Sequence, residues 1–207
     1  MTKIAIVTGA SRGFGRGTAR ILASEAGYKV YATARTQSAL QSLQKEVAES
    51  NGAGEVIPVV LDQSVDEAVA AFVRRVSASE EKIDLLVNSA YAGLIAMTPH
   101  FGKPFWERPI SVFDGSVDIG VRGAYVMSAL VAPAMVKAKS GLIVQISSYG
   151  GFAYVFDVGY GVAHAAMDRL SFDMATELQD HGVRAVTLPP AGGKTEVTAF
   201  PEGESPT

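Results

Sequence analysis

Tyr160 and His164 could together carry out proton-transfer chemistry. They are four residues apart in the segment YGVAH, a spacing that places both side chains on one face of a helix. An unperturbed phenol has a pKa of about 10, so only about one tyrosine in a thousand is ionised at pH 7 unless a nearby cation lowers that pKa. Histidine, with a reference pKa of about 6.5, is mostly neutral at pH 7. The structural alternatives are a core tyrosine and a helix histidine without a chemical role.

The segment TGASRGFG (Thr8–Gly15) has the composition of a phosphate-binding turn. It follows an apolar strand pattern and opens a helical one, and it contains Gly9, Gly13 and Gly15. Glycine allows a sharp turn and lets the backbone approach a pyrophosphate at the amino terminus of the following helix. The pattern therefore predicts a dinucleotide site, while a tight strand-to-helix turn without a ligand is the alternative.

The second predicted strand, at Lys29–Arg35, ends in an arginine rather than an acidic residue. The segment ATARTQ places Arg35 where a carboxylate would hydrogen-bond the ribose hydroxyls of NAD. An arginine at this position would instead pair with the 2′-phosphate of NADP, and Arg12 in the glycine turn could supply a second guanidinium. These two arginines predict NADP(H) rather than NAD(H), although either could be a solvated surface residue.

The candidate residues fall within a repeating pattern of strands and helices. Short β-branched runs predict strands at Lys3–Thr8, Lys29–Arg35, Val56–Asp62, Ile83–Asn88, Leu142–Ser148 and Arg184–Leu188. Helical spacing predicts helices at Gly15–Glu25, Ser38–Ser50, Ser64–Ser79, Ser111–Lys137 and Ala163–His181. Strands that are apolar on both faces and separated by helices indicate a parallel sheet covered on both sides. We expect a single α/β domain over residues 1–207, with a frayed polar tail at 197–207.

Composition argues against several classes of protein. The chain has 18 basic and 21 acidic residues, a net charge of −3 and no Lys/Arg-rich run, so nucleic acid is not an expected partner. Without cysteine there can be neither disulfides nor thiolate chemistry, and His100, His164 and His181 lack metal-ligand spacing. The chain enters its first strand without a secretory signal, and its longest apolar stretch, Ala124–Val136, is too short to span a bilayer. We therefore expect a soluble protein without a metal site.

One long segment, from Ala90 to Pro109, is rich in glycine and proline and has no strong helical or strand pattern. A loop of this length in a compact domain is usually functional. Its aromatic residues, together with those of a later loop, suggest the mouth of an apolar pocket: Phe101, Phe105, Trp106, Phe152, Tyr154 and Phe156. The alternative is that these aromatic side chains only cover the core.

Several motifs together resemble those of the short-chain dehydrogenase/reductase family. They are the TG-x3-G-x-G turn, NSAYAG after the fourth predicted strand and Tyr160 in YxxxH. The segments PFWERP, IGVRGAY, GLIVQISS and YGVAHAAMDRL narrow the resemblance to one subgroup, and it extends from Lys3 to about Glu196. The resemblance implies a Rossmann-type, doubly wound parallel sheet flanked by helices, and an oxidoreductase that binds a nicotinamide dinucleotide.

The resemblance also implies roles for individual residues. Tyr160 would be the acid that protonates the carbonyl oxygen and Ser148 the residue that orients it, with Ser147 as the alternative. The implied cofactor contacts are Gly9, Ser11, Arg12, Gly13, Phe14, Gly15, Arg35, Asp62, Asn88, Ala90, Tyr160, His164, Pro190 and Thr195. Asp62 would bond the adenine amino group, although it could also cap the helix predicted to follow it.

The sequence departs from the family pattern at several points. His164 occupies the place of the lysine that lowers the tyrosine pKa and binds the nicotinamide ribose. Gly120 replaces an asparagine that helps to hold a proton-relay water, although the subgroup shares this glycine. The family's Pro-Gly turn appears as Pro190-Ala191. The chain also ends where family members continue, so we expect it to lack their C-terminal strand and the segment that covers the substrate.

The leading hypothesis is an NADPH-dependent reductase of a ketone, steroid or xenobiotic carbonyl, with His164 as a weak stand-in for lysine. If His164 must be charged, activity should improve below neutral pH, and His164→Lys should raise the rate at pH 7. The alternative is a non-catalytic NADP(H)-binding domain with a degenerate active site. A third possibility is that His164 and the early end are errors in the sequence of a fuller enzyme.

The resemblance further implies an oligomer and a location. Family members form dimers or tetramers through two long helices, here predicted at Ser111–Lys137 and Ala163–His181. We therefore expect a homodimer or homotetramer that acts on a small-molecule carbonyl or alcohol. A cytoplasmic location is expected, with association with the endoplasmic reticulum as the alternative.

Overall fold

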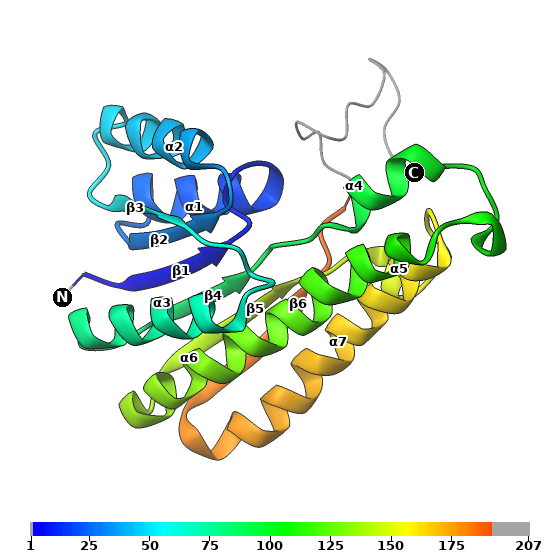
Figure 1. Ribbon diagram of the computed structural model, residues 1–207. Helices are drawn as coiled ribbons and strands as arrows, with labels where there is room; N and C mark the ends of the chain where they lie inside the picture. Colours follow the sequence, from blue (N-terminus) through cyan, green and yellow to red (C-terminus); the bar gives the residue numbers. More distant parts are fainter. Residues whose placement is uncertain (1, 192–207) are drawn as a thin grey trace.

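The computed structural model describes residues 2–191, which form a sheet of six parallel strands with helices on both faces (Figure 1). The strands are β1 (Ile4–Thr8), β2 (Lys29–Ala34), β3 (Glu55–Val60), β4 (Leu85–Asn88), β5 (Gly141–Ile146) and β6 (Val183–Leu188). Their order across the sheet is β3-β2-β1-β4-β5-β6. This order reverses direction between β1 and β4, the place where doubly wound sheets bind dinucleotides beyond the carboxyl ends of their strands. The predicted Rossmann-type fold and its strands are confirmed.

Seven α-helices connect the strands among the described residues. They are α1 (Gly13–Ser24), α2 (Gln37–Glu49), α3 (Asp66–Ser79), α4 (Gly93–Met97), α5 (Ile110–Val117), α6 (Ala124–Ala138) and α7 (Val158–Leu178). Helices α1 and α2 share one core cluster with the sheet, and α3, α6 and α7 share the other. Successive residues of β1 show why: Ile4 and Ile6 belong to one cluster, whereas Ala5 and Val7 belong to the other. The sheet is therefore apolar on both faces, as its sequence indicates.

Two of the predicted helices differ from the structure. The helix predicted at Ser111–Lys137 consists of α5 and α6 joined by a π-helical segment, Asp118–Gly123. The helix predicted from Ala163 begins earlier, at Val158, because the side chain of Asp157 caps its first turn. The long loop before α5 is also more regular than its composition indicates, since it contains α4 and two short 3-10 turns, at Thr98–His100 and Phe105–Glu107.

The continuous helical run Ile110–Ala138 has the length and apolar composition of a membrane span, with a mean hydropathy of 1.5. Its residues Met127, Val131 and Met135 are fully buried in the cluster that α3 and α7 also line. Core helices of soluble proteins meet the same criteria of length and composition. We therefore interpret the part of the run that carries these three residues as packed in the protein core, with 39% of the most apolar window buried.

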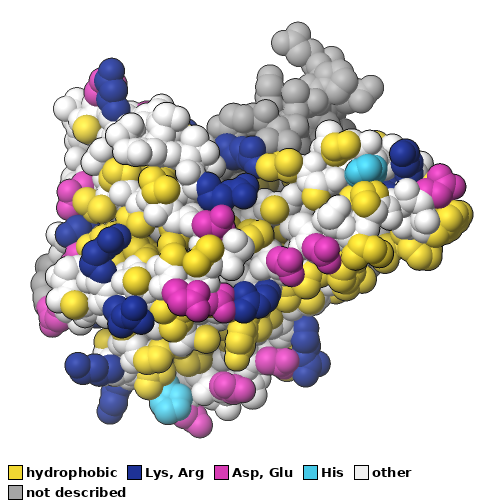
Figure 2. Space-filling view, in the orientation of Figure 1, with side chains coloured by type: hydrophobic (Ala, Val, Ile, Leu, Met, Phe, Trp, Pro, Cys, Tyr) yellow, Lys and Arg dark blue, Asp and Glu magenta, His cyan; other side chains and the backbone are white. Residues whose placement is uncertain are grey.

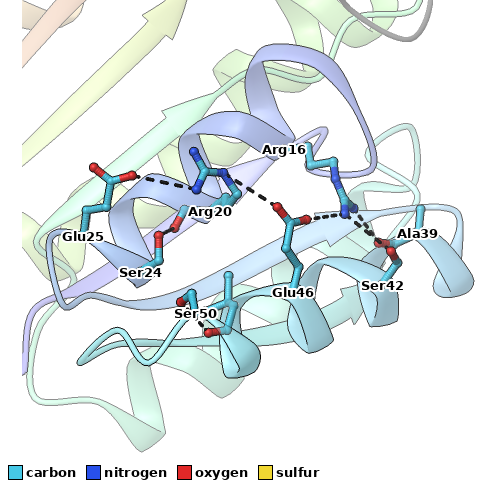
Figure 3. A network of polar contacts seen from close by, with 9 residues as sticks. Arg16, Arg20, Ser24, Glu25, Ala39, Ser42, Glu46 and Ser50 are labelled. Carbon is cyan, nitrogen blue, oxygen red and sulfur yellow. Dashed lines mark hydrogen bonds and ion pairs between the residues drawn. The ribbon is translucent and has the colours of Figure 1, made fainter.

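Helix α1, which follows the glycine turn, is joined to α2 by a polar network (Figure 3). The Arg16 guanidinium forms an ion pair with Glu46 at 2.7 Å and donates a hydrogen bond to the carbonyl oxygen of Ala39 at 3.0 Å. Arg20 lies 3.8 Å from both Glu46 and Glu25. Partly exposed ion pairs of this kind contribute only about 0–1 kcal/mol each, so the network mainly fixes the orientation of α1.

Two glycines near the start of α1 give a matched test of this packing. A Cβ atom on Gly15 would lie 2.4 Å from the carbonyl oxygen of Gly9, whereas one on Gly17 would meet nothing within 4 Å. Gly15→Ala is expected to lower the free energy of unfolding by about 1–3 kcal/mol, because the backbone of the turn must move. Gly17→Ala is expected to raise it by about 0.5–1 kcal/mol, since alanine favours helix. Urea denaturation measures both, and equal midpoints for the two variants would contradict this account.

Candidate functional site

The glycine turn is closely packed against the loop that follows β4. Gly9 and Gly13 have φ angles of 69° and 54°, which favour glycine because a Cβ atom is strained there. The hydroxyl of Thr8 accepts hydrogen bonds from the backbone nitrogens of Ser89 and Ala90, at 3.0 and 3.1 Å. A Cβ atom on Gly9 would come within 2.7 Å of the Cα of Ala90. Thr8, which sequence analysis did not select, therefore joins the two loops at the carboxyl edge of the sheet.

The amino terminus of α1 and the predicted phosphate contacts face solvent. Arg12 is the N-cap residue of α1, and its side chain makes no capping hydrogen bond within residues 2–191. Arg12, Phe14 and Arg35 are exposed, and Ser11 is half-buried. A helix amino terminus beside two exposed arginine side chains is a favourable environment for phosphate groups. This part of the chain fits the dinucleotide that the glycine turn predicts.

Asp62 closes a turn and does not cap α3. Its Oδ1 accepts hydrogen bonds from the backbone nitrogen and the hydroxyl of Ser64, at 2.9 and 2.7 Å. These hydrogen bonds, together with the positive charge of Arg35, lower the pKa of the Asp62 carboxyl. The predicted helix cap is wrong, because α3 begins only at Asp66 and its N-cap residue is Val65. Asp62 is half-buried, and it lies near enough to Arg35 for that charge to act on its carboxylate.

Asn88, the last residue of β4, is buried. Its Nδ2 donates a hydrogen bond to the hydroxyl of Ser128 on α6 at 2.9 Å, and its Oδ1 has no hydrogen-bond partner among the described residues. The side chain thus joins β4 to α6 beneath the site. A direct cofactor contact of Asn88 stays a prediction. Ala90 is half-buried at the contact with Gly9.

The structure places Ser148, rather than Ser147, beside Tyr160. The Ser147 hydroxyl is buried and donates to the carbonyl oxygen of His164 at 3.4 Å. The Ser148 hydroxyl accepts a hydrogen bond from the backbone nitrogen of Gly150 at 3.2 Å, and it lies near enough to the Tyr160 phenol to act on its pKa. Burial raises the pKa of the Tyr160 phenol, and the Ser148 hydroxyl only partly opposes this. Tyr160 is therefore a protonated phenol over the neutral pH range.

His164 lies directly against Tyr160 but is a poor cation. The two ring centroids are 4.0 Å apart, and Nδ1 of His164 lies 2.8 Å from the backbone carbonyl oxygen of Tyr160. Because a carbonyl oxygen only accepts, this contact assigns a proton to Nδ1. Burial lowers the pKa of His164, while the hydrogen bond and the charge of Asp168 act in the opposite direction. The imidazole is thus neutral at pH 7, and the structure gives no basis for a gain in activity just below neutrality.

Tyr91 is a third aromatic residue of the site, which sequence analysis did not select. Its ring centroid is 5.9 Å from that of Tyr160 and 5.0 Å from that of His164, and its hydroxyl donates to Ser116 at 3.1 Å. Burial strongly raises the pKa of its phenol. A Cβ atom on Gly120 would lie 2.7 Å from a carbon of the Tyr91 ring. In the sequence, the signal for this contact was Tyr91 in NSAYAG and Gly120 in IGVRGAY. The Tyr91 ring fills the space that a side chain at position 120 would occupy.

Exposed aromatic side chains surround this end of the molecule. Figure 2 shows hydrophobic side chains gathered along the projection that contains α5 and the start of α7. The exposed aromatics of the loops near the site are Phe101, Phe105, Trp106, Tyr149, Phe152 and Tyr154. Phe156 is less exposed, because its ring packs against Tyr160 at 5.0 Å. The aromatic residues that were predicted at a pocket mouth are therefore at the surface on the side of Tyr160.

The remaining predicted contacts lie beyond β6. Pro190 is half-buried two residues after the end of this strand. Thr195 lies outside the described residues. Within residues 2–191, no group of three or more His, Asp or Glu side chains could hold a metal ion. The geometry thus brings together a phosphate-binding turn, two arginines and a serine–tyrosine pair at one edge of the sheet.

Comparison with known proteins accounts for this arrangement. The family model of the short chain dehydrogenases matches residues 3–203. The chain belongs to the short-chain dehydrogenase family. It is 44% identical over 196 residues to Dehydrogenase/reductase SDR family member 1 of Mus musculus, and 43% identical to the protein of that name from Homo sapiens. The aligned region covers 94% of this chain and 62% of each relative.

Solved structures of the family agree with the fold and include complexes with a dinucleotide. A crystal structure of a metagenomic short-chain oxidoreductase in complex with NADP superimposes with a TM-score of 0.82 at 33% identity. The superposition covers 92% of this chain and 82% of the other. The NADP-dependent 3-hydroxy acid dehydrogenase YdfG of Salmonella typhi is 30% identical over 188 residues, which are 90% of this chain and 71% of that protein.

The neutral state of His164 predicts a pH dependence of stability. Its pKa is lowered in the folded protein, so below a pH of about 6.5 the unfolded state binds more protons than the folded state. The free energy of unfolding should therefore fall as the pH drops through that range. In His164→Phe, which keeps an aromatic ring but cannot titrate, Tm should fall less between pH 8 and pH 5. His181→Gln, at an exposed histidine, is the matched control, and parallel curves for wild type and His164→Phe would contradict the account.

The contact between Gly120 and Tyr91 predicts which residues this position tolerates. Gly120→Asn is expected to lower the free energy of unfolding by about 1–3 kcal/mol, because the new side chain overlaps the Tyr91 ring and the Cε of Met167. The double variant with Tyr91→Ala should recover part of this loss. Gly17→Asn makes the same change at a helical position with open space and serves as the control. The account is wrong if Gly120→Asn is no less stable than Gly17→Asn in urea.

Proposed function

We propose that this chain is an NADP(H)-dependent oxidoreductase that reduces a ketone, steroid or xenobiotic carbonyl, with Tyr160 as the proton donor. The observation that carries the proposal is that Ser148 lies near enough to the buried Tyr160 phenol to act on its pKa, at the same carboxyl edge of the sheet as the glycine turn. Membership of the family and an NADP-bound relative of the same fold support it. As for the location of the protein, we propose the cytoplasm, with association with the endoplasmic reticulum as the alternative.

The residues at the carboxyl edge suit NADP(H) in particular. A Cβ atom on Gly9 or Gly15 would collide with neighbouring backbone, and Gly13 has a φ of 54°, so the turn keeps its shape only with glycine at these positions. Arg12 and Arg35 are exposed, and neither side chain has a hydrogen bond or ion pair within residues 2–191. Both guanidinium groups are thus available to a 2′-phosphate, and no carboxylate follows β2 to repel it.

The mechanism that we propose depends on the protonated state of Tyr160. When bound, NADPH supplies the hydride. Ser148 would hold the substrate oxygen by a hydrogen bond, and the Tyr160 hydroxyl would donate its proton to the same oxygen as negative charge develops there. Because burial raises the pKa of Tyr160, the donor is present over the whole neutral range. His164 would pack against the phenol without charging it, so regaining the proton from solvent would be slow.

A non-catalytic NADP(H)-binding domain is the second candidate function. The observation that favours it is the neutral, buried His164, which occupies the place of the family's lysine. A protein of this kind would keep the glycine turn and both arginines but would not exchange protons efficiently. It predicts cofactor binding without turnover.

We further propose that the protein forms a homodimer or homotetramer through α6 and α7. Apolar side chains that the core leaves exposed support this proposal: Tyr125 on α6, and Val162 and Phe172 on α7. Exposed apolar side chains on neighbouring helices are typical of surfaces that bind another copy. The oligomer would bury both helices away from the glycine turn.

Cofactor binding and turnover on one preparation test the proposed function. NADPH should bind more tightly than NADH, and Arg35→Ala or Arg12→Ala should weaken NADPH binding about 10- to 100-fold, because each removes a charge-assisted contact to a phosphate. NADH affinity should change little. Arg20→Ala, on the same helix as the turn but paired with Glu25 and Glu46, is the control. Tighter binding of NADH than of NADPH would refute the cofactor assignment.

The second part of the same experiment adds a panel of ketones, steroids and aromatic aldehydes to the NADPH complex. Oxidation of NADPH by the wild type, lost in Tyr160→Phe with NADPH affinity retained, supports the reductase. A faster rate at pH 7 in His164→Lys supports the interpretation of His164 as a weak stand-in for a lysine cation, and a variant no faster than the parent refutes it. Binding of NADPH without oxidation across the panel supports the non-catalytic candidate.

A further inference from the structure

The first turn of α7, which carries Tyr160, is held by a carboxylate whose two oxygens are both used. Asp157 is the N-cap residue of α7, and its Oδ1 accepts a hydrogen bond from the backbone nitrogen of Tyr160 at 2.6 Å. Its Oδ2 accepts a hydrogen bond from Nη1 of Arg108 at 2.5 Å. Arg108 lies 49 residues earlier in the chain, at the end of the long loop before α5. The backbone position of Tyr160 therefore depends on a contact with a distant segment.

This ion pair differs from the others in its burial. The side chains of Arg108 and Asp157 are 6% and 4% exposed, whereas in every other ion pair within residues 2–191 both side chains are at least 12% exposed. The Nε of Arg108 also donates a hydrogen bond to the carbonyl oxygen of Lys103 at 2.7 Å. One guanidinium thus joins the middle of the loop to the start of α7.

The loop before α5 and the residues just before α7 also hold the ring of Tyr160 in place. Phe156, immediately before Asp157, has a φ of 63°, a left-handed conformation that is strained for a non-glycine residue. In this conformation its ring packs edge-on against Tyr160 at 5.0 Å and contacts Phe101 of the loop at 6.1 Å. Strain of this kind persists only where surrounding contacts hold it. The contacts that flank Phe156 are the ion pair of Asp157 and the aromatic loop.

A buried ion pair adds little net stability compared with apolar residues of similar volume, because both charges lose their hydration. Such a pair can instead select one arrangement of the groups around it, since a charge left alone in the protein interior is costly. Here the ion pair would select the position and orientation of the first turn of α7, and with them the position of Tyr160. Gly159 and Gly161, on either side of Tyr160, contribute no side chains to this arrangement.

We propose that Arg108 is a positioning residue for Tyr160, which acts through Asp157 and ties the first turn of α7 to the loop at residues 101–108. The proposal rests on the proposed function in its claim about turnover, but its structural part is independent of it. Arg108 touches neither Tyr160 nor the glycine turn in any described contact. Its effect should therefore appear in the order of α7 and in kcat, while the affinity for NADPH is retained.

Amide hydrogen exchange on the full chain tests the structural part. In Arg108→Met, which keeps the length of the side chain and removes its charge, the amide of Tyr160 should exchange at least about ten-fold faster than in the wild type, because its acceptor is no longer held. Arg108→Lys, which restores the charge but not the second donor, should be intermediate. Arg169→Met is the matched control, since it removes an exposed ion pair with Asp173 on the same helix. Wild-type exchange at Tyr160 in Arg108→Met overturns the proposal.

Steady-state kinetics test the functional part. In Arg108→Met, kcat should fall at least about ten-fold with an unchanged Kd for NADPH, whereas Arg169→Met should match the wild type. A fall in NADPH affinity with an unchanged kcat would overturn the proposal. If the wild type shows no turnover, the proposed function fails, and the exchange experiment alone still decides whether Arg108 holds the first turn of α7.

A double variant covers the case in which Arg108→Met does not fold because Asp157 is left as a lone buried charge. Arg108→Met with Asp157→Asn removes both charges and leaves an amide oxygen to cap Tyr160, so this variant should fold. The proposal expects faster exchange at Tyr160 and a lower kcat in this folded variant. Wild-type exchange with wild-type kcat would show that capping without Arg108 is sufficient, and would overturn it.

Discussion

Burial of the Tyr160 phenol, with no cationic side chain among residues 2–191 to lower its pKa, is the constraint on which this site depends. The ring is enclosed by Tyr91, Phe156 and His164, and only the Ser148 hydroxyl favours ionisation. An apolar environment stabilises the neutral phenol over the phenolate. The proposed proton donor is therefore held in its protonated form at neutral pH, which the proposed reduction of a carbonyl requires.

The sheet explains how the separate parts of the site come together. Parallel strands end at one edge, and the order of β1, β4 and β5 brings the glycine turn, the loop after β4 and Ser148 to neighbouring positions there. The hydroxyl of Thr8 holds the first two of these together. Helix α7 then places Tyr160 beside Ser148, and its angle is set at its first turn by Asp157 and Arg108.

The sequence predicted the sheet well because its strands carry an unambiguous signal. They are apolar on both faces, so their ends were placed within two residues of the observed ones. The start of α7 was predicted five residues too late because Gly159 and Gly161 weaken the helical pattern, although Asp157 is a recognisable capping residue. The choice between Ser147 and Ser148 required the structure, since a shift of one residue exchanges the two faces of a strand.

Contacts between distant segments could not be predicted from local patterns. Tyr91 and Gly120 fit each other across 29 residues, and Arg108 meets Asp157 across 49. Neither pair follows the regular spacing of a helix or a strand, so only the fold shows that the two residues of each pair are neighbours. The same holds for His164, whose position in the sequence suggested a substitute cation, whereas its burial and its hydrogen bond to the Tyr160 carbonyl make it a neutral packing residue.

The most direct test of the central claim is the pH dependence of kcat in both directions of the reaction, measured between pH 6 and pH 10.5. With a buried phenol and no cation beside it among residues 2–191, carbonyl reduction should stay constant up to about pH 9, because the proton donor is intact. Alcohol oxidation should rise steadily between pH 6 and pH 10.5 as the phenolate forms. A reduction rate that falls near pH 7, or oxidation that is already maximal there, would show that the pKa of Tyr160 is depressed. Either result would contradict a site in which burial keeps the Tyr160 phenol protonated.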